Sequence, residues 1–118
     1  MSKILHHYIN GQKVEGTSGR FGDVFNPATG EVAARVPLAS RSETAKAIEV
    51  AAAAFPDWRD TPALRRARIL FRFKELLDTN LDELAKLVSA EHGKVLSDAR
   101  GSVIRGIEVV EFATGAPN

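Results

Sequence analysis

The sequence contains no cysteine among its 118 residues, and only one methionine, one tryptophan and one tyrosine. The absence of cysteine excludes disulfides, thiolate metal sites and a cysteine nucleophile within these residues. Charge of one sign is not in excess either, because 16 Lys and Arg residues oppose 15 Asp and Glu residues, for a formal net charge of +1. Such a balance gives no overall attraction to nucleic acid or to an anionic membrane.

Long hydrophobic runs are also missing. None approaches the roughly 20 residues of a membrane-spanning helix, and residues 1–10 show neither a secretory hydrophobic region nor a long transit peptide rich in Arg and Ser. We therefore expect a cytoplasmic protein without a membrane partner. Hydrophobic residues make up 44% and charged residues 26%, as is typical of a globular protein, and the length suits one domain or part of one.

Short strands joined by tight turns are predicted for the first 40 residues. Asn10-Gly11 is typical of a two-residue hairpin turn, because it supplies the positive φ angles that such turns need. A second turn is predicted at 26–30, where the Asn26 side chain can accept a hydrogen bond from the backbone ahead of it. The flanking strands are expected at 8–9, 13–14, 23–25 and 32–36.

Beyond residue 40 the hydrophobic period becomes helical and predicts four helices. The fold class of these residues is therefore α+β, with N-terminal β-hairpins followed by four α-helices. The first helix is expected to have Ser42 as its N-cap and to end at Pro56. The second is expected to have Thr61 as its N-cap and Pro62 at its first helical position. The third is expected to begin after Asn80 as N-cap and to end at Gly93, and the fourth to cover about 95–113.

The fourth helix has apolar residues on two faces. Val109 and Phe112 lie with Arg105 on the side opposite the main apolar stripe, which is a pattern of helices enclosed within a larger structure. Gly101 and Gly106 each cost about 1 kcal/mol relative to alanine in a helix interior, and such glycines indicate close approach by another element. We expect a piece of something longer or an obligate oligomer. The main stripe consists of Leu96, Ala99, Val103, Ile107 and Val110.

Three segments carry a resemblance to a known family. Residues 26–32, Asn-Pro-Ala-Thr-Gly-Glu-Val, resemble the N-terminal signature of the aldehyde dehydrogenase superfamily, and Glu91-His92-Gly93-Lys94 resembles its Glu-x-Gly-Lys turn. Residues 65–73 fit the second helix of that family. The resemblance implies that 1–118 is the N-terminal part of the NAD-binding domain, with hairpins in 1–40 and helices in 41–118, in a parent α/β fold with a Rossmann-like NAD domain.

The last segment resembles one branch of this family. Residues 105–113, Arg-Gly-Ile-Glu-Val-Val-Glu-Phe-Ala, followed by Gly-Ala-Pro, are similar to the methylmalonate-semialdehyde dehydrogenases, also called malonate-semialdehyde dehydrogenases. This implies NAD-dependent, coenzyme A-acylating oxidation of malonate or methylmalonate semialdehyde to acetyl-CoA or propionyl-CoA, with loss of CO2. It also implies a homo-oligomer. The catalytic cysteine, the oxyanion-stabilising asparagine and the lysine that holds the cofactor ribose would lie outside these residues, together with the oligomerisation part.

Arg105 is the one predicted substrate-binding residue. The resemblance implies a clamp for the distal carboxylate of the substrate, aimed into a cleft, and a planar guanidinium suits a carboxylate because it can donate two parallel hydrogen bonds. The alternative is an ordinary pair with Glu108, three residues further along the helix. No catalytic, cofactor-binding or metal residue is predicted here, so the 118 residues alone are expected to be inactive and to bind no cofactor.

The remaining candidates favour structural roles. His92 is expected at a helix C-terminus, where the helix dipole favours it, and His6 and His7 are expected to face solvent. Three other functions stay open: a non-acylating aldehyde dehydrogenase, a non-catalytic helical module that self-associates around Val109 and Phe112, and nucleic-acid binding through a basic run. For that basic run, the near-zero net charge favours a solvated helix face or pairing with acidic groups such as Glu75 and Asp78. The run consists of Arg59, Arg65, Arg66, Arg68, Arg72 and Lys74.

Overall fold

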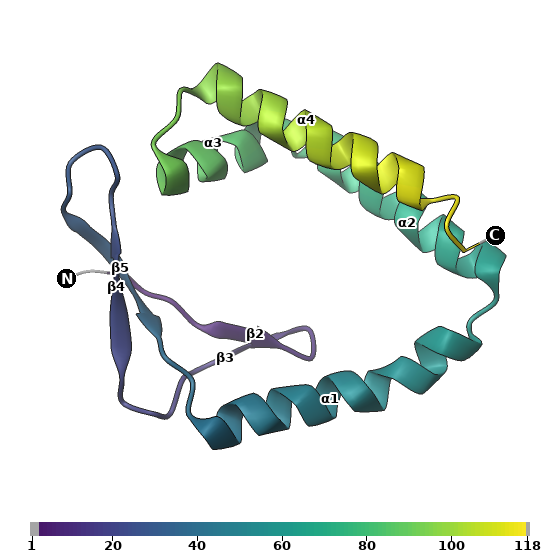
Figure 1. Ribbon diagram of the computed structural model, residues 1–118, viewed down its shortest axis with the longest axis horizontal. Coiled ribbons are helices and arrows are strands. Elements are labelled where there is room, and N and C mark those ends of the chain that lie inside the picture. The colour runs from purple at the N-terminus through teal and green to yellow at the C-terminus, as the bar shows by residue number, and fades with distance from the viewer. Residues whose placement is uncertain (1–2, 118) are drawn as a thin grey trace. The chain divides into compact units, whose positions relative to one another are not determined.

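The computed structural model describes residues 3–117 and contains short strands followed by long helices (Figure 1). The chain forms two compact units, Met1–Arg59 and Asp60–Asn118. The strands followed by helices confirm the α+β class. The helix that begins at residue 41 was expected with the other helices, in 41–118, but it belongs mostly to the first unit. The elements are β1 (Lys3–Ile4), β2 (His7–Ile9), β3 (Gln12–Val14), β4 (Phe21–Phe25), β5 (Val32–Pro37), α1 (Arg41–Asp60), α2 (Ala63–Thr79), α3 (Leu81–His92) and α4 (Leu96–Ala113).

The strands form a hairpin and a small sheet. β2 and β3 pair antiparallel around Asn10, with φ of 54°, and Gly11, with φ of 73°, which confirms the predicted turn. The sheet has the order β1-β5-β4, with β4 antiparallel and β1 parallel to β5. The turn at 26–30 also has its predicted form, because the Ala28 N–H donates to Asn26 Oδ1 at 2.9 Å.

Helix α1 begins one residue before the predicted N-cap, so the expectation for Ser42 was wrong. Ser40 caps this helix instead: the Glu43 N–H donates to Ser40 Oγ at 3.2 Å, and the Ser40 N–H donates to Glu43 Oε2 at 2.8 Å. This is a capping box, which requires Glu three residues after the cap, and Ser40 alone has that spacing. The same carboxylate accepts the Thr17 N–H at 2.7 Å and ties the preceding loop to α1.

Prolines do not end or begin helices where predicted. Helix α1 continues through Pro56 to Asp60. A proline inside a helix removes one backbone donor and crowds the carbonyl four residues earlier, but its φ lies in the helical range, so the chain can stay helical beyond it. Helix α2 begins at Ala63, so Pro62 rather than Thr61 occupies the N-cap position, with φ of −53° and ψ of 142°. The Pro62 carbonyl accepts the Arg65 and Arg66 N–H groups, which starts the helix one residue later than expected.

Asn80 and Gly93 delimit α3 as predicted, but Asn80 acts differently. Asn80 lies at the N-cap without a side-chain cap hydrogen bond, and its amide donates instead to the Leu76 carbonyl at 2.7 Å, at the end of α2. Gly93 has φ of 85°, the left-handed conformation that ends helices.

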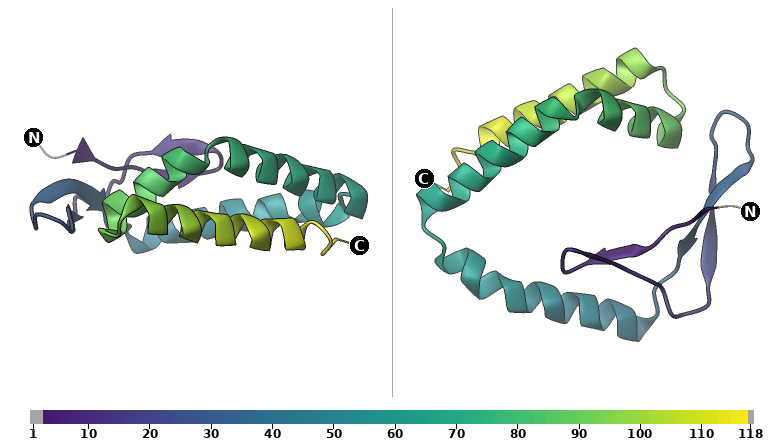
Figure 2. Two further views of the ribbon diagram at one scale, coloured as in Figure 1. Left: turned by 90° about the horizontal axis from the view of Figure 1, so that it is seen from above. Right: turned by 180° about the vertical axis from the view of Figure 1, so that it is seen from behind.

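The second unit packs three helices through small residues. Helix α4 runs back along α2 and contacts both α2 and α3 (Figure 2). Ala67, Ala85 and Ala99 are buried where the helices meet, and Ala99 has no exposed surface. Ile107 is also buried, which confirms the main stripe of α4, although Leu96 at its beginning is half exposed. Alanine contacts let the helix backbones approach closely, so this core depends on fit rather than on large side chains.

The second apolar face of α4 is uncovered. Val109 is 66% exposed and Phe112 is 88% exposed. The expected close approach to the glycines is wrong for residues 3–117: a Cβ at Gly106 would have nothing within 4 Å, and one at Gly101 would meet the Arg105 side chain of the same helix. Within residues 3–117, every helix is too short or too polar to span a bilayer.

Candidate functional site

The turn between α3 and α4 fixes the position of Lys94. Gly93 reverses the chain, and its N–H donates to the Ser89 carbonyl at 2.8 Å. The Ser89 hydroxyl then donates to the Lys94 carbonyl at 2.7 Å, which closes the turn from the other side. Because Val95 is extended and α4 begins directly after it, the Lys94 side chain can lie along the first turns of α4.

Four polar residues form a cluster along α4, which we call the α4 cluster: Lys94, Asp98, Ser102 and Arg105. Lys94 Nζ lies 2.9 Å from Asp98 Oδ2 and donates to Ser102 Oγ at 2.9 Å. Arg105 Nη2 donates to the same oxygen at 3.2 Å. These residues are three or four positions apart, the spacing that places side chains on one side of a helix.

The α4 cluster contains more positive than negative charge. The hydrogen bond from Lys94 lowers the pKa of Asp98 below its ordinary value, with the Lys94 charge second and the Arg105 and His92 charges adding smaller effects. Asp98 is therefore ionised at neutral pH and offsets Lys94. Because no ion pair joins Arg105 to a carboxylate in the part of the chain that the structure describes, the unpaired positive charge lies on Arg105.

The Arg105 guanidinium is turned back along its own helix. It bonds Ser102, one turn earlier, rather than pairing with Glu108 one turn later, so that alternative is not what the structure shows. This direction follows the general tilt of helical side chains toward the N-terminus. A guanidinium has five N–H donors, and the bond to Ser102 uses one of them. Arg105 is exposed, so its remaining donors are accessible in the part of the chain that the structure describes.

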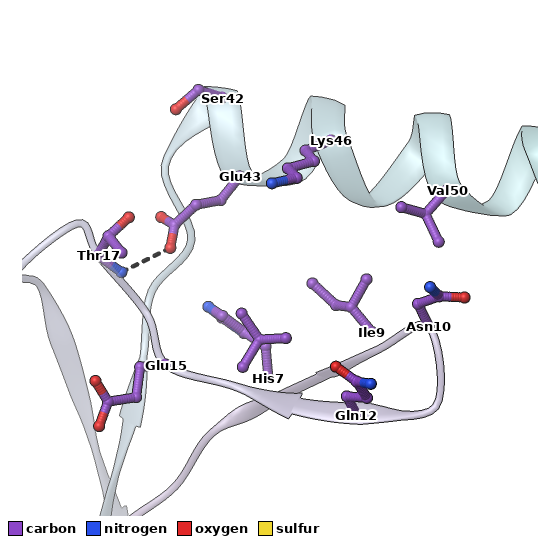
Figure 3. Close-up of a pocket in the computed structure, with 11 residues that line it drawn as sticks. His7, Ile9, Asn10, Gln12, Glu15, Thr17, Ser42, Glu43, Lys46 and Val50 are labelled. Carbon is purple, nitrogen blue, oxygen red and sulfur yellow. Dashed lines mark hydrogen bonds between the residues drawn. The ribbon is translucent and has the colours of Figure 1, made fainter.

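The first unit contains a hollow of about 510 Å³ between the β2–β3 hairpin and α1 (Figure 3). His7 lines it and is half-buried, with Nε2 buried and without a hydrogen-bond partner. The expectation that His7 faces solvent was therefore wrong, because strand alternation turns it away from the exposed side chains of His6 and Tyr8. The lining also includes Ile9, Asn10, Gln12, Val14, Glu15, Thr17, Ser42, Glu43, Lys46 and Val50.

The other predicted residues have structural positions. His92 is exposed at the last residue of α3, as expected, and within residues 3–117 no group of three His, Cys, Asp or Glu side chains could hold a metal ion. On α2, Arg72 pairs with Glu75, and Lys74 Nζ lies 2.9 Å from Asp78 Oδ2. These ion pairs fit the solvated face predicted for the basic run.

Sequence reasoning predicted a role for Arg105 but did not predict the groups around it. Lys94 was assigned only to the helix turn, and Asp98 and Ser102 were not singled out. The spacing of 94, 98, 102 and 105 was a usable signal, because it repeats every three or four residues from the end of the turn.

The family model and the curated relatives that match this chain all point to one protein family. The sequence model of the aldehyde dehydrogenase family matches residues 13–118. A malonate-semialdehyde dehydrogenase of Pseudomonas aeruginosa is 55% identical over 113 residues, covering 96% of this chain and 22% of that protein. Malonate-semialdehyde dehydrogenase 3 of Geobacillus kaustophilus is 56% identical over 116 residues, covering 98% of this chain and 24% of that protein. The chain thus spans about a quarter of the length of these curated relatives.

Solved structures agree with the sequence comparison. A methylmalonate-semialdehyde dehydrogenase of Oceanimonas doudoroffii has a TM-score of 0.91 and 51% identity, covering 99% of this chain and 24% of that chain. A Sinorhizobium meliloti protein, assigned as a methylmalonate-semialdehyde dehydrogenase and complexed with NAD, has a TM-score of 0.94 and 50% identity with the same coverage. The strands and helices of this chain are therefore part of the α/β aldehyde dehydrogenase fold, and the chain belongs to the aldehyde dehydrogenase family.

Proposed function

We propose that this chain is part of an NAD-dependent, coenzyme A-acylating semialdehyde dehydrogenase. The reaction converts malonate semialdehyde, NAD and coenzyme A to acetyl-CoA, CO2 and NADH, and methylmalonate semialdehyde gives propionyl-CoA in the same way. The names of the relatives, at 55% and 56% identity over nearly the whole chain, support this substrate class. A neighbouring structure complexed with NAD supports the choice of cofactor.

The unpaired charge of Arg105 is the observation that carries the proposal. Malonate semialdehyde has an aldehyde at one end and a carboxylate, ionised at neutral pH, at the other. A guanidinium with four free N–H donors can bind that carboxylate through two parallel hydrogen bonds while the aldehyde reacts elsewhere. Arg105 would therefore select substrates that carry an acid group and orient them until CO2 is lost.

The turn from β5 to α1 does not fit a dinucleotide. Dinucleotide sites use a glycine-rich turn between a strand and a helix, with the pyrophosphate at the helix N-terminus. In the turn from β5 to α1 no glycine is present, and the Glu43 carboxylate already accepts the Ser40 N–H at that helix end. We therefore assign NAD to other parts of the enzyme. Because these residues contain no cysteine, a cysteine nucleophile would also lie elsewhere, and this chain supplies the carboxylate-binding group.

A chimera tests the proposed reaction. The segment of the Pseudomonas aeruginosa enzyme that matches this chain is replaced by these residues, and NADH and acetyl-CoA are measured with malonate semialdehyde, NAD and coenzyme A. We expect both products in equal amounts from the chimera and neither from the 118-residue chain alone. NADH without acetyl-CoA would instead favour a non-acylating aldehyde dehydrogenase, and activity of the 118 residues alone would contradict the assignment of the nucleophile elsewhere.

Arg105→Ala in the chimera tests the carboxylate clamp. Hydrogen bonds between charged groups contribute roughly 1.5–3 kcal/mol, so we expect kcat/KM for malonate semialdehyde to fall about 10- to 150-fold. Propionaldehyde lacks the acid group and should be affected less than twofold. Arg105→Lys keeps the charge but not the planar fork, so it should give an intermediate loss. Equal losses on both aldehydes would refute the clamp.

A further inference from the structure

The hydroxyl of Ser102 is fully engaged by the α4 cluster. A hydroxyl has one donor and two acceptor positions. Ser102 Oγ donates to the Asp98 carbonyl at 3.3 Å and accepts from Lys94 Nζ at 2.9 Å and from Arg105 Nη2 at 3.2 Å. Its proton is thus directed at the backbone of its own helix, and both of its acceptor positions face cations.

This arrangement fixes one edge of the Arg105 guanidinium. An exposed arginine without such a partner samples many rotamers, and binding a ligand confines it to one of them at a cost in conformational entropy. The bond from Nη2 to Ser102 selects the rotamer in which the group lies back over the preceding turn. The guanidinium then lies over Gly101, where Nη1 would be 3.6 Å from a Cβ built at that position, an ordinary contact distance.

Lys94 and Asp98 hold the serine in turn. Lys94 Nζ bonds both the Ser102 hydroxyl and the Asp98 carboxylate, so the hydroxyl cannot rotate away without breaking a bond to a charged group. Because the Lys94 charge is offset by Asp98, Lys94 orients Ser102 without offering a competing site for an anion. With one edge of the Arg105 guanidinium bound to Ser102, the N–H groups on its other edge stay free for a ligand.

We propose that Ser102 is a positioning residue that holds the Arg105 guanidinium in the orientation that receives the carboxylate of the substrate. The inference rests on the proposed function and adds the group that prepares the clamp before substrate arrives. Preorganisation of this kind lowers the cost of ordering a side chain on binding, so its loss weakens binding of the acid rather than the chemical step.

The test compares two variants of Ser102 with a matched control in the chimera. Ser102→Ala removes the acceptor, Ser102→Thr keeps a hydroxyl at the same position, and Ser97→Ala removes an exposed serine elsewhere on α4. We expect Ser102→Ala to raise KM for malonate semialdehyde about 3- to 10-fold, with kcat and the KM for propionaldehyde changed less than twofold. Ser102→Thr and Ser97→Ala should remain within twofold of the unsubstituted chimera for both aldehydes.

Arg105→Ala measured in parallel separates the two proposals. If Arg105→Ala selectively weakens the acid substrate while Ser102→Ala leaves its KM unchanged, the role of Ser102 is refuted and the clamp stands. If Ser102→Thr loses as much as Ser102→Ala, the hydroxyl is not the positioning group and the inference fails. If Arg105→Ala affects both aldehydes equally, the clamp and the role of Ser102 fall together.

Discussion

Gly106 offers a sharp test of how this chain packs. The residue lies inside α4, beside a hollow of about 360 Å³ on the apolar side of the second unit, and a Cβ there would have nothing within 4 Å. Gly106→Ala therefore adds helix propensity without a steric cost. Alanine is favoured over glycine by about 1 kcal/mol in a helix interior. We expect the free energy of unfolding of the 118-residue chain to rise by about that amount.

The assay is urea and thermal unfolding of the chain, followed by far-UV circular dichroism. For a unit of this size, about 1 kcal/mol corresponds to an increase of roughly 4–8 °C in the midpoint. Gly93→Ala is the matched control with the opposite expected sign, because Gly93 has φ of 85° and alanine is strained there. A Gly106→Ala chain no more stable than the unsubstituted one would refute the open packing described for this side of α4.

Two further predictions concern stability. Ala99 has no exposed surface where α4 meets its neighbours, so Ala99→Val should lower the free energy of unfolding by about 1–3 kcal/mol in urea titrations. The control, Ala90→Val at an exposed position of α3, should change it by less than about 1 kcal/mol. Equal effects of the two substitutions would contradict the close packing. The backbone hydrogen bond from Ser40, followed by that from Thr17, lowers the pKa of Glu43 to about 2, below the ordinary 4.5. The stability that Glu43 contributes is therefore full above pH 4.5 and lost as the pH falls toward 2. Unfolding of the Glu43→Gln chain should lose this part of the pH dependence, and an unchanged profile would contradict the role of the carboxylate.

Local chemistry made the turns of this fold predictable. Asn10-Gly11 and the Asn26 turn depend on residues adjacent in sequence, and both have the predicted form. Strand β1 was missed because two residues form a strand only by pairing with β5, about 30 positions away. The first helix start was missed because Ser40 and Ser42 are both good caps, and the choice depends on the spacing of Ser40 to Glu43.

The geometry of the candidate site could not be predicted from the sequence. The resemblance to semialdehyde dehydrogenases predicts Arg105 as a substrate-binding residue, and that role stays a prediction. The orientation of its guanidinium depends on the rotamers of Lys94 and Ser102, which no sequence pattern fixes. Gly101 shows the same difference. Its position inside a helix indicated close approach by another element, whereas the nearest atom to a Cβ built there is Arg105 Nη1 of the same helix, at an ordinary 3.6 Å.

A crystal structure of the chimera with bound malonate, a stable compound that carries the same carboxylate as the substrate, tests the central claim most directly. The account predicts that two guanidinium N–H groups of Arg105 donate to one malonate carboxylate, while Nη2 keeps its bond to Ser102 Oγ. A malonate bound in the active site by other groups, with the Arg105 side chain directed into solvent, would contradict it.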